Sequence, residues 1–309
     1  MIYTLTVNPA LDYTMEIHGL TRGAVNRAQT ARITPGGKGI NVSIVLKNLE
    51  IENRILGFIA GFTGLEIENS LNSLGHSSDF VKLSGGLTRV NVKLLDNDTT
   101  DLNAPGPEID SAALNELYAK LDRLQDGDIL VLSGAVPSSL PDYSYALIME
   151  RLAGKKVRSC VDASGSQLLK SLPCHPFLIK PNIDELNGLF SINISSRAEV
   201  IKYALKLKEM GAENVLVSLG AEGAVLAGSD GHIYEAFAPS GIPMSTVGAG
   251  DSMIAGFLYG YLKASDSEKL SEGLRFGIGA GSATVFSNHL AYKDDILALA
   301  NRTKVSMAQ

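Results

Sequence analysis

Residues 245–253 have the sequence STVGAGDSM and form the most informative stretch of the chain. The apolar residues that follow recur with the period of an α-helix: Met253, Ile254, Phe257, Leu258, Tyr261 and Leu262. The glycines therefore stand at a helix N-terminus, where unpaired backbone N–H groups and the helix dipole favour an anion. Only glycine or another small residue lets an oxyanion approach the backbone closely. The stretch predicts an anion-binding turn beside Asp251, although an Asp at a helix start also stabilises the helix dipole without any further role.

The two common nucleotide-binding motifs are absent from the chain. A G-x-G-x-x-G fingerprint that began at Gly248 would need glycine where the chain has Met253. A P-loop needs Gly-Lys followed by Ser or Thr, whereas Lys38 is followed by Gly39. This argues against a dinucleotide-dependent oxidoreductase and favours another phosphate-handling fold.

Away from this turn, short apolar runs alternate with helical patterns. The runs are residues 128–133, 157–162, 177–180 and 214–219. The helical residues between them are Leu114, Leu117, Tyr118, Leu121 and Leu124, then Val200, Tyr203, Ala204, Leu207 and Met210, and near the start of the chain Val42, Val45, Leu46 and Leu49. This alternation predicts parallel βαβ units, and continuous apolar strands are typical of a sheet covered on both faces.

Residues 89–95 follow a different pattern, because Val90, Val92 and Leu94 alternate with polar neighbours. Such a strand has one apolar and one polar face, and residues 12–18 alternate more weakly. We expect a small separate sheet, built from about residues 12–34 and 88–104, whose polar face borders a solvated and charged site. The whole chain, 1–309, is then a single α/β domain that carries this sheet as a lid subdomain.

The composition excludes several classes of protein. The 27 Lys and Arg residues against 33 Asp and Glu residues give a net charge of −6, so there is no basic surplus for a nucleic-acid partner. The two cysteines are too few for a disulfide framework, and the five histidines have no metal-ligand spacing. We see no signal peptide and no apolar run of the roughly 20 residues that cross a bilayer. We expect a cytoplasmic protein with no membrane partner.

Four short motifs, in this order and spacing, resemble the signature regions of the ribokinase-like (PfkB) sugar kinases. They are GGKGIN at 36–41, NIDE at 182–185, SLGAEG at 218–223 and TVGAGD at 246–251. The resemblance spans nearly the whole chain, from Asn8 to about Ser287. It implies a three-layer sandwich with a mostly parallel central sheet and a small β-sheet lid, and an activity that uses ATP and Mg²⁺.

The resemblance also implies catalytic roles. Asp251 is the expected general base on the attacking sugar hydroxyl. The amides of Gly248, Ala249 and Gly250 are expected to hold the charge on the transferring phosphoryl group as an anion hole.

For the nucleotide, the resemblance places Lys180 on the ATP phosphates and makes Asn182 and Glu185 organise Mg²⁺, partly through water. The residues expected to shape the ATP pocket, together with Gly248 and Gly250, are Ser218, Gly220 and Gly223. Taken one at a time, Glu185 also fits a solvated helix residue, Lys180 a strand-end lysine, and the glycines an ordinary turn.

For the sugar, the resemblance implies that Asp12, Gly37 and Asn41 contact hydroxyls. The segments GGKG at 36–39, TRVNVKL at 88–94 and NAPGP at 103–107 look most like 1-phosphofructokinases, with tagatose-6-phosphate kinases as close relatives. Lys38 and Arg89 are then expected on the phosphate of a phosphorylated ketohexose, because converging cations suit an anionic substrate. The resemblance also implies Arg27, donated by a partner subunit, on this phosphate, and Asn103 on the sugar.

The expected reaction is the ATP-dependent phosphorylation of fructose 1-phosphate to fructose 1,6-bisphosphate. Tagatose 6-phosphate and fructose 6-phosphate stay open as alternative substrates. A non-catalytic sugar- or nucleotide-binding regulator is a further alternative, although a pure binder needs no base at Asp251. The apolar face of the lid must be buried somewhere, and in related kinases two lids pack together, so the resemblance implies a homodimer that forms through the lid.

Overall fold

The structure, a computed structural model, describes residues 1–96 and 98–308. Within these residues, ten strands form one large sheet. In spatial order they are β14 (Val305–Met307), β13 (Ile233–Ala236), β12 (Ala224–Ala227), β11 (Asn214–Ser218), β10 (Leu178–Ile179), β9 (Arg158–Asp162), β8 (Ile129–Ser133), β1 (Ile2–Thr6), β4 (Asn53–Ala60) and β5 (Val81–Leu83). The run from β11 to β5 is parallel, whereas β12, β13 and β14 pair antiparallel at one edge.

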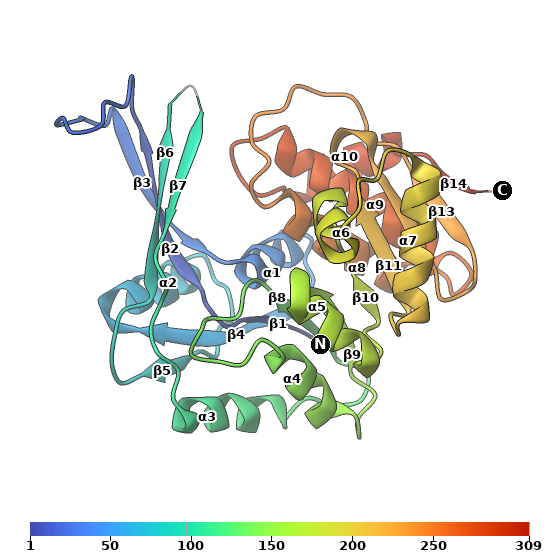
Figure 1. The fold of residues 1–309 in the computed structure, drawn as a ribbon, viewed down its shortest axis with the longest axis horizontal. Coiled ribbons are helices and arrows are strands. Elements are labelled where there is room, and N and C mark those ends of the chain that lie inside the picture. Colours follow the sequence, from blue (N-terminus) through green and yellow to red (C-terminus); the bar gives the residue numbers. More distant parts are fainter. Residues whose placement is uncertain (97, 309) are drawn as a thin grey trace.

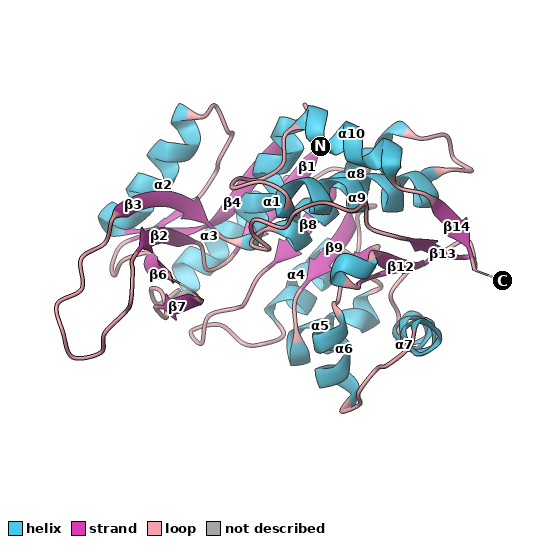
Figure 2. Cartoon of the chain, turned by 90° about the horizontal axis from the view of Figure 1, so that it is seen from above, coloured by secondary structure: helices cyan, strands magenta, loops and turns pink. Residues whose placement is uncertain are grey.

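Helices cover both faces of the large sheet, which gives three layers (Figures 1 and 2). One face packs against α1 (Lys38–Asn48), α8 (Ala249–Lys263), α9 (Lys269–Val285) and α10 (Lys293–Arg302). The other packs against α3 (Ser111–Leu121), α4 (Ser144–Leu152), α5 (Gly165–Ser171), α6 (Ile183–Phe190) and α7 (Arg197–Glu209). Two short 3₁₀ helices, η1 (Leu172–Cys174) and η2 (Gly220–Glu222), lie in the connections. Side chains of β8, β9 and β11 alternate between the two cores, as the pleat requires.

Four strands form a second, small sheet that projects from the layered body (Figure 1). Its order is β3 (Thr30–Gly36), β2 (Ala10–Glu16), β6 (Arg89–Leu95) and β7 (Thr99–Asn103). We call it the small sheet. At its base, Leu11 and Val90 join a third apolar cluster with Ile67 and Leu71 of α2 (Gly61–Ser73).

The predicted α/β class, with a mostly parallel central sheet and a small separate sheet, is confirmed. The four apolar runs are β8, β9, β10 and β11, and the helical patterns are α1, α3 and α7. They were recognisable because strands buried on both faces are continuously apolar, while each helix buries only a stripe. Among the described residues, no helix is long and apolar enough to span a membrane.

Candidate active site

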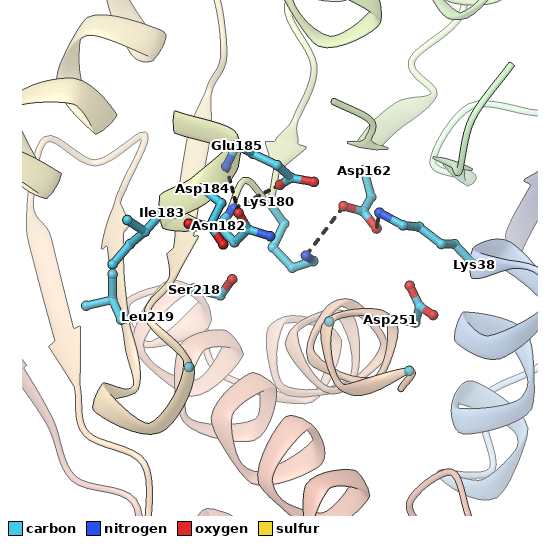
Figure 3. Close-up of a pocket in the computed structure, with 13 residues that line it drawn as sticks. Lys38, Asp162, Lys180, Asn182, Ile183, Asp184, Glu185, Ser218, Leu219 and Asp251 are labelled. Atoms are coloured by element: carbon cyan, nitrogen blue, oxygen red, sulfur yellow. Dashed lines mark hydrogen bonds and ion pairs between the residues drawn. The ribbon is translucent and has the colours of Figure 1, made fainter. Parts of the chain in front are cut away.

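A pocket of about 600 Å³ lies at the carboxyl ends of β9, β10 and β11 (Figure 3). Open parallel sheets bind ligands at this edge. The predicted site residues that line it are Lys38, Lys180, Asn182, Glu185, Ser218, Gly220, Gly248, Gly250 and Asp251. The other lining residues are Asp162, Ile183, Asp184 and Leu219. Folding therefore brings Lys38 of α1 together with predicted residues from the middle of the chain, such as Lys180, and from its last third, such as Asp251.

The glycine turn begins α8 as the spacing predicts. Gly248 is the N-cap and has the left-handed φ of 79° that glycine adopts without strain. The Ala249 amide donates to the carbonyl of Thr246 at 3.3 Å. Among the described residues, the amides of Gly248 and Gly250 meet no acceptor. Two of the three predicted anion-hole amides are thus available to a ligand, and Ala249 is already partnered.

Asp251 lies in the first turn of α8 and is only 6% exposed. Its Oδ2 accepts a hydrogen bond of 2.8 Å from Nδ2 of Asn41 on α1. Burial, and then the negative charge of Asp162, raises the pKa of Asp251 to about 6. The Asn41 hydrogen bond and the charges of Lys38 and Lys180 act in the opposite direction. A carboxylate with this pKa is ionised at neutral pH and accepts a proton more readily than an ordinary one.

Asp162, at the end of β9, joins two of the predicted cations. Its side chain is 1% exposed, with Oδ2 at 3.1 Å from Nζ of Lys38 and Oδ1 at 3.4 Å from Nζ of Lys180. Burial alone would raise the pKa of Asp162, but the lysine charges outweigh it and hold the pKa below its usual value. Burial would lower the pKa of Lys38, and Asp162 and Asp251 together raise it.

Sequence reasoning missed Asp162. The available signal is a carboxylate that directly ends an apolar run, at the sheet edge where sites form. A single Asp in that place is common in loops, so nothing local distinguishes it.

Asn182 and Glu185 form a reciprocal capping box at the start of α6. The Asn182 side chain accepts from the Glu185 amide at 2.7 Å, and Glu185 Oε2 accepts from the Asn182 amide at 2.9 Å. No group of three or more His, Cys, Asp or Glu residues in the described parts of the chain is placed to hold a metal. The carboxylates of Glu185 and Asp184 that face the pocket fit a Mg²⁺ ion held largely by water and phosphate.

The turn between β11 and β12 forms one wall of the pocket. Ser218 pairs with Asn182 across an isolated bridge, which aligns this turn with the start of α6. Gly220 has a φ of 58° and lines the pocket. Gly223 does not line it, and a Cβ there would lie 2.0 Å from the carbonyl oxygen of Ala236. Close packing of β13 therefore accounts for Gly223.

Two of the predicted sugar-binding residues, Asp12 and Asn103, lie on one face of the small sheet, whereas Lys38 and Asp251 line the pocket. Asp12, Asn91 and Asn103 are register neighbours on β2, β6 and β7. Asn91 Nδ2 donates to Asp12 Oδ1 at 3.1 Å, and Lys93 Nζ lies 3.8 Å from Asp12 Oδ2. Burial raises the pKa of Asp12 against the opposing effects of Lys93 and Asn91.

The remaining predicted residues, Arg89, Gly37 and Arg27, lie on β6, at the start of α1 and in a loop. Arg89 Nε donates to the carbonyl of Asn8 at 3.2 Å. Gly37, the N-cap of α1, has a φ of 130°, and a Cβ there would meet Thr6 at 2.7 Å. Arg27 lies exposed in the loop between β2 and β3 and does not line the pocket.

Comparisons with known proteins cover the whole chain. Residues 5–295 match the model of the pfkB family carbohydrate kinases. The 1-phosphofructokinase of Bacillus subtilis is 41% identical over 306 residues, with 99% of both chains covered. The D-tagatose-1-phosphate kinase of Bacillus licheniformis is 37% identical over 291 residues, with 94% of both chains covered. The structure of phosphofructokinase-2 from Escherichia coli in complex with substrates and products has a TM-score of 0.90, 28% identity, and coverage of 97% of this chain and 98% of that chain.

Proposed function

The chain belongs to the pfkB family of carbohydrate kinases, and we propose that it transfers the γ-phosphoryl group of ATP to fructose 1-phosphate, which gives fructose 1,6-bisphosphate and ADP. As a carbohydrate kinase it is a phosphotransferase with an alcohol group as acceptor. The observation that carries the choice of sugar is the full-length similarity, at 41% identity, to a relative named 1-phosphofructokinase.

In this reaction Asp251 is the general base. The 6-hydroxyl of the sugar gives its proton to the carboxylate while its oxygen forms the new bond to phosphorus, and the bond to the ADP oxygen breaks. The burial of Asp251 and its raised pKa support this role, and a positioned base contributes roughly 10²–10⁴-fold to the rate.

The glycine turn stabilises the charge on the transferring group. The free amides of Gly248 and Gly250 point from the N-terminus of α8, where the helix dipole also favours negative charge. Phosphoryl transfer depends mainly on positioning and on charge stabilisation of this kind.

The pocket takes the phosphates of ATP, with Lys180 as their cation and the turn at Ser218 and Gly220 beside the nucleotide. The charged residues that line the pocket are two lysines, Lys38 and Lys180, and four acids, Asp162, Asp184, Glu185 and Asp251. Because the acids outnumber the lysines, phosphates need a further cation, which supports Mg²⁺ near Asn182 and Glu185. Bound there, Mg²⁺ would neutralise phosphate charge in the transition state.

The phosphate already present on the sugar binds Lys38 and Arg89, and its hydroxyls face Asp12 and Asn103 on the small sheet. Lys38 is half-exposed at the pocket and is the first residue of α1, which only Gly37 separates from the end of β3 of the small sheet. This connection supports a substrate held between the pocket and the small sheet, which then acts as a lid.

We also propose a homodimer through the apolar face of the small sheet. Ile33, Tyr13, Val92 and Leu102 occupy one register row across all four strands. At its two ends Ile33 is 53% exposed and Leu102 is 56% exposed. A second copy would cover this row, and it would bring another copy of the loop that carries Arg27.

A second sugar is favoured by one observation, the 37% identity to a D-tagatose-1-phosphate kinase. Tagatose 1-phosphate therefore joins tagatose 6-phosphate and fructose 6-phosphate as an alternative substrate on the same chemistry. A non-catalytic regulator is disfavoured because it needs neither the buried base nor the free glycine amides.

The test is ADP production by the purified protein with Mg²⁺ and ATP, offered each of the four sugar phosphates separately. We expect kcat/KM for fructose 1-phosphate to exceed the others by about a hundredfold, roughly 3 kcal/mol of transition-state discrimination. A preference for another sugar phosphate would correct the substrate and leave the base in place. No turnover with any of them would overturn the proposed function.

A further inference from the structure

Asp162 is the most deeply buried charged group of the pocket and has no part in the phosphoryl transfer described above. Its 1% exposed carboxylate divides its two oxygens between two lysines, Oδ2 toward Lys38 and Oδ1 toward Lys180 (Figure 3). The two lysines come from α1 and from the residue after β10, so this single carboxylate links distant segments of the chain.

Other donors do not hold this carboxylate. Among the described residues, only Lys38 and Lys180 lie within reach of the two oxygens of Asp162, and no further donor binds them. Ser133, its register neighbour on β8, is fully buried, yet its hydroxyl also has no partner within the described chain. A buried charge is stable only when it is paired. The position of Asp162 therefore depends on the lysines, and the positions of the lysines depend on Asp162.

Strand pairing in the backbone places Asp162 and Lys180 side by side. Val161 is the register partner of Ile179, so Asp162 and Lys180 are the next residues along two adjacent parallel strands. Successive side chains alternate between faces, which places both on the face toward α1 and α8. Lys38 reaches the same carboxylate from the first position of α1, so this ion pair ties the start of α1 to the large sheet.

We propose that Asp162 is a positioning residue, whose two oxygens keep Lys38 and Lys180 apart so that each lysine serves one of the two phosphorylated substrates. The inference rests on the proposed function, in which Lys38 binds the phosphate of the sugar and Lys180 binds the phosphates of ATP. Without this shared counter-ion, two cations in one pocket attract the same phosphate and misalign the two substrates.

Asp162→Asn removes the charge and keeps the shape. Misplacement of reacting groups by about 1 Å costs on the order of 10² in rate, so we expect kcat to fall about a hundredfold. The KM values for both substrates should stay the same or fall, because the lysines lose a competing anion. If kcat per folded enzyme stays within about threefold of the unmodified protein, or both KM values rise in parallel with kcat unchanged, the proposal is wrong.

The pH profile gives a readout that a merely structural role does not move. Asp251 faces Asp162, Lys38 and Lys180, and its carboxylate accepts from Asn41. Loss of the Asp162 charge removes the one neighbouring acid that raises the pKa of Asp251, while the two lysines and the Asn41 amide, which favour the ionised carboxylate, stay in the pocket. The acid limb of kcat/KM should therefore move to lower pH in Asp162→Asn. An acid limb that stays in place or moves to higher pH contradicts the proposal.

Asp128→Asn is the matched control. Asp128 is also a buried acid, 8% exposed, and it pairs with the N-terminal ammonium group at 2.8 Å just before β8, at the opposite end of the large sheet. This variant should lose thermal stability and keep the kcat and the acid limb of the unmodified protein.

A double-mutant cycle tests the link to the lysine directly. In a Lys180→Met background, Asp162→Asn should cost much less in kcat/KM than it does alone, because the partner to be positioned is gone. Additive costs would show that the two residues act independently and would overturn the proposal.

Titration calorimetry with ADP tests the charge arrangement without turnover. ADP should bind Asp162→Asn at least as tightly as the unmodified protein, and weaker binding contradicts the proposal. If the unmodified protein turns over no sugar phosphate but calorimetry gives the expected result, the proposed function fails and the pairing of the lysines stands. If turnover is normal and the Asp162 variants behave like the control, only the inference fails.

Discussion

The pocket and the polar face of the small sheet both gather charged side chains, but they are built differently. In the pocket, Asp251, Asp162 and Lys180 are each at most 6% exposed, and they stand at the ends of strands and helices of the layered body. On the small sheet, Asn103 is exposed, as is Arg27 in the loop between β2 and β3, and Asp12 accepts a hydrogen bond from Asn91 of the neighbouring strand. A change in the pocket therefore disturbs buried charges, whereas a change on the small sheet can alter recognition without disturbing the core.

This contrast predicts that substitutions in the pocket reduce kcat, whereas substitutions on the small sheet act on the KM of the sugar or on association.

We expect the largest effect from Asp251→Asn. This change removes the base and keeps a side chain that can still contact Asn41, so kcat should fall by about 10²–10⁴-fold. Binding of fructose 1-phosphate, measured by calorimetry, should persist. Asp266→Asn is the control, since its side chain is 95% exposed outside the pocket. Full activity of Asp251→Asn would remove the base from the mechanism.

Arg89→Gln tests the small sheet. Loss of a charge-assisted hydrogen bond costs about 1.5–3 kcal/mol, so the KM for fructose 1-phosphate should rise about 10–100-fold. The KM for ATP and the kcat should change little. Arg54→Gln, on the exposed part of β4, is the control. A loss in kcat with an unchanged KM for the sugar would contradict the proposal that the small sheet binds the sugar while the pocket carries out the transfer.

The pH dependence tests the burial of the pocket. Asp251 must be ionised to accept a proton, and its pKa of about 6 means that it is protonated as the pH falls through this value. Below pH 6 we expect kcat/KM to fall about tenfold per unit, and above it to level off. An acid limb near the ordinary pKa of an exposed Asp, about 4, would contradict this prediction, because it would show that burial does not raise the pKa of Asp251 in the working enzyme.

The smallest catalytic effect should come from Leu102→Asp, which places a charge on the exposed apolar row of the small sheet. Analytical ultracentrifugation should show association weakened by about tenfold or more. We expect kcat to be unchanged and the KM for the sugar phosphate to rise a few-fold if Arg27 comes from the partner. Leu205→Asp is the control, because Leu205 is 42% exposed on α7. An unaltered dimer, or a monomeric unmodified protein, would refute the interface.

Much of the fold was predictable because its signals are local. The apolar runs that became β8, β9 and β11 need no information from elsewhere in the chain, and the alternation in residues 89–95 indicates a sheet with two unlike faces. The glycine turn before α8 is likewise a local signal, because the helix start and the small residues are adjacent in sequence.

The parts that could not be predicted depend on pairings between distant residues. Asn41 and Asp251 are hydrogen-bonded across 210 positions of the chain, and no local pattern reveals this contact. The motif at Asn182 and Glu185 suggested a metal site, yet the structure shows that the same two residues also cap a helix. Sequence spacing does not separate these two roles, because both need an oxygen at each of the same positions.

The amino-acid sequence by itself determined several of the strands and helices, the glycine turn at a helix start and the candidate base, because each depends on the chemistry of a few consecutive residues. Only the tertiary structure decided that Asp162 joins Lys38 and Lys180, and that Asp12, Asn91 and Asn103 form one row. The physical reason is strand register: hydrogen bonds between neighbouring strands determine which side chains are neighbours, and those bonds exist only once the sheets have formed.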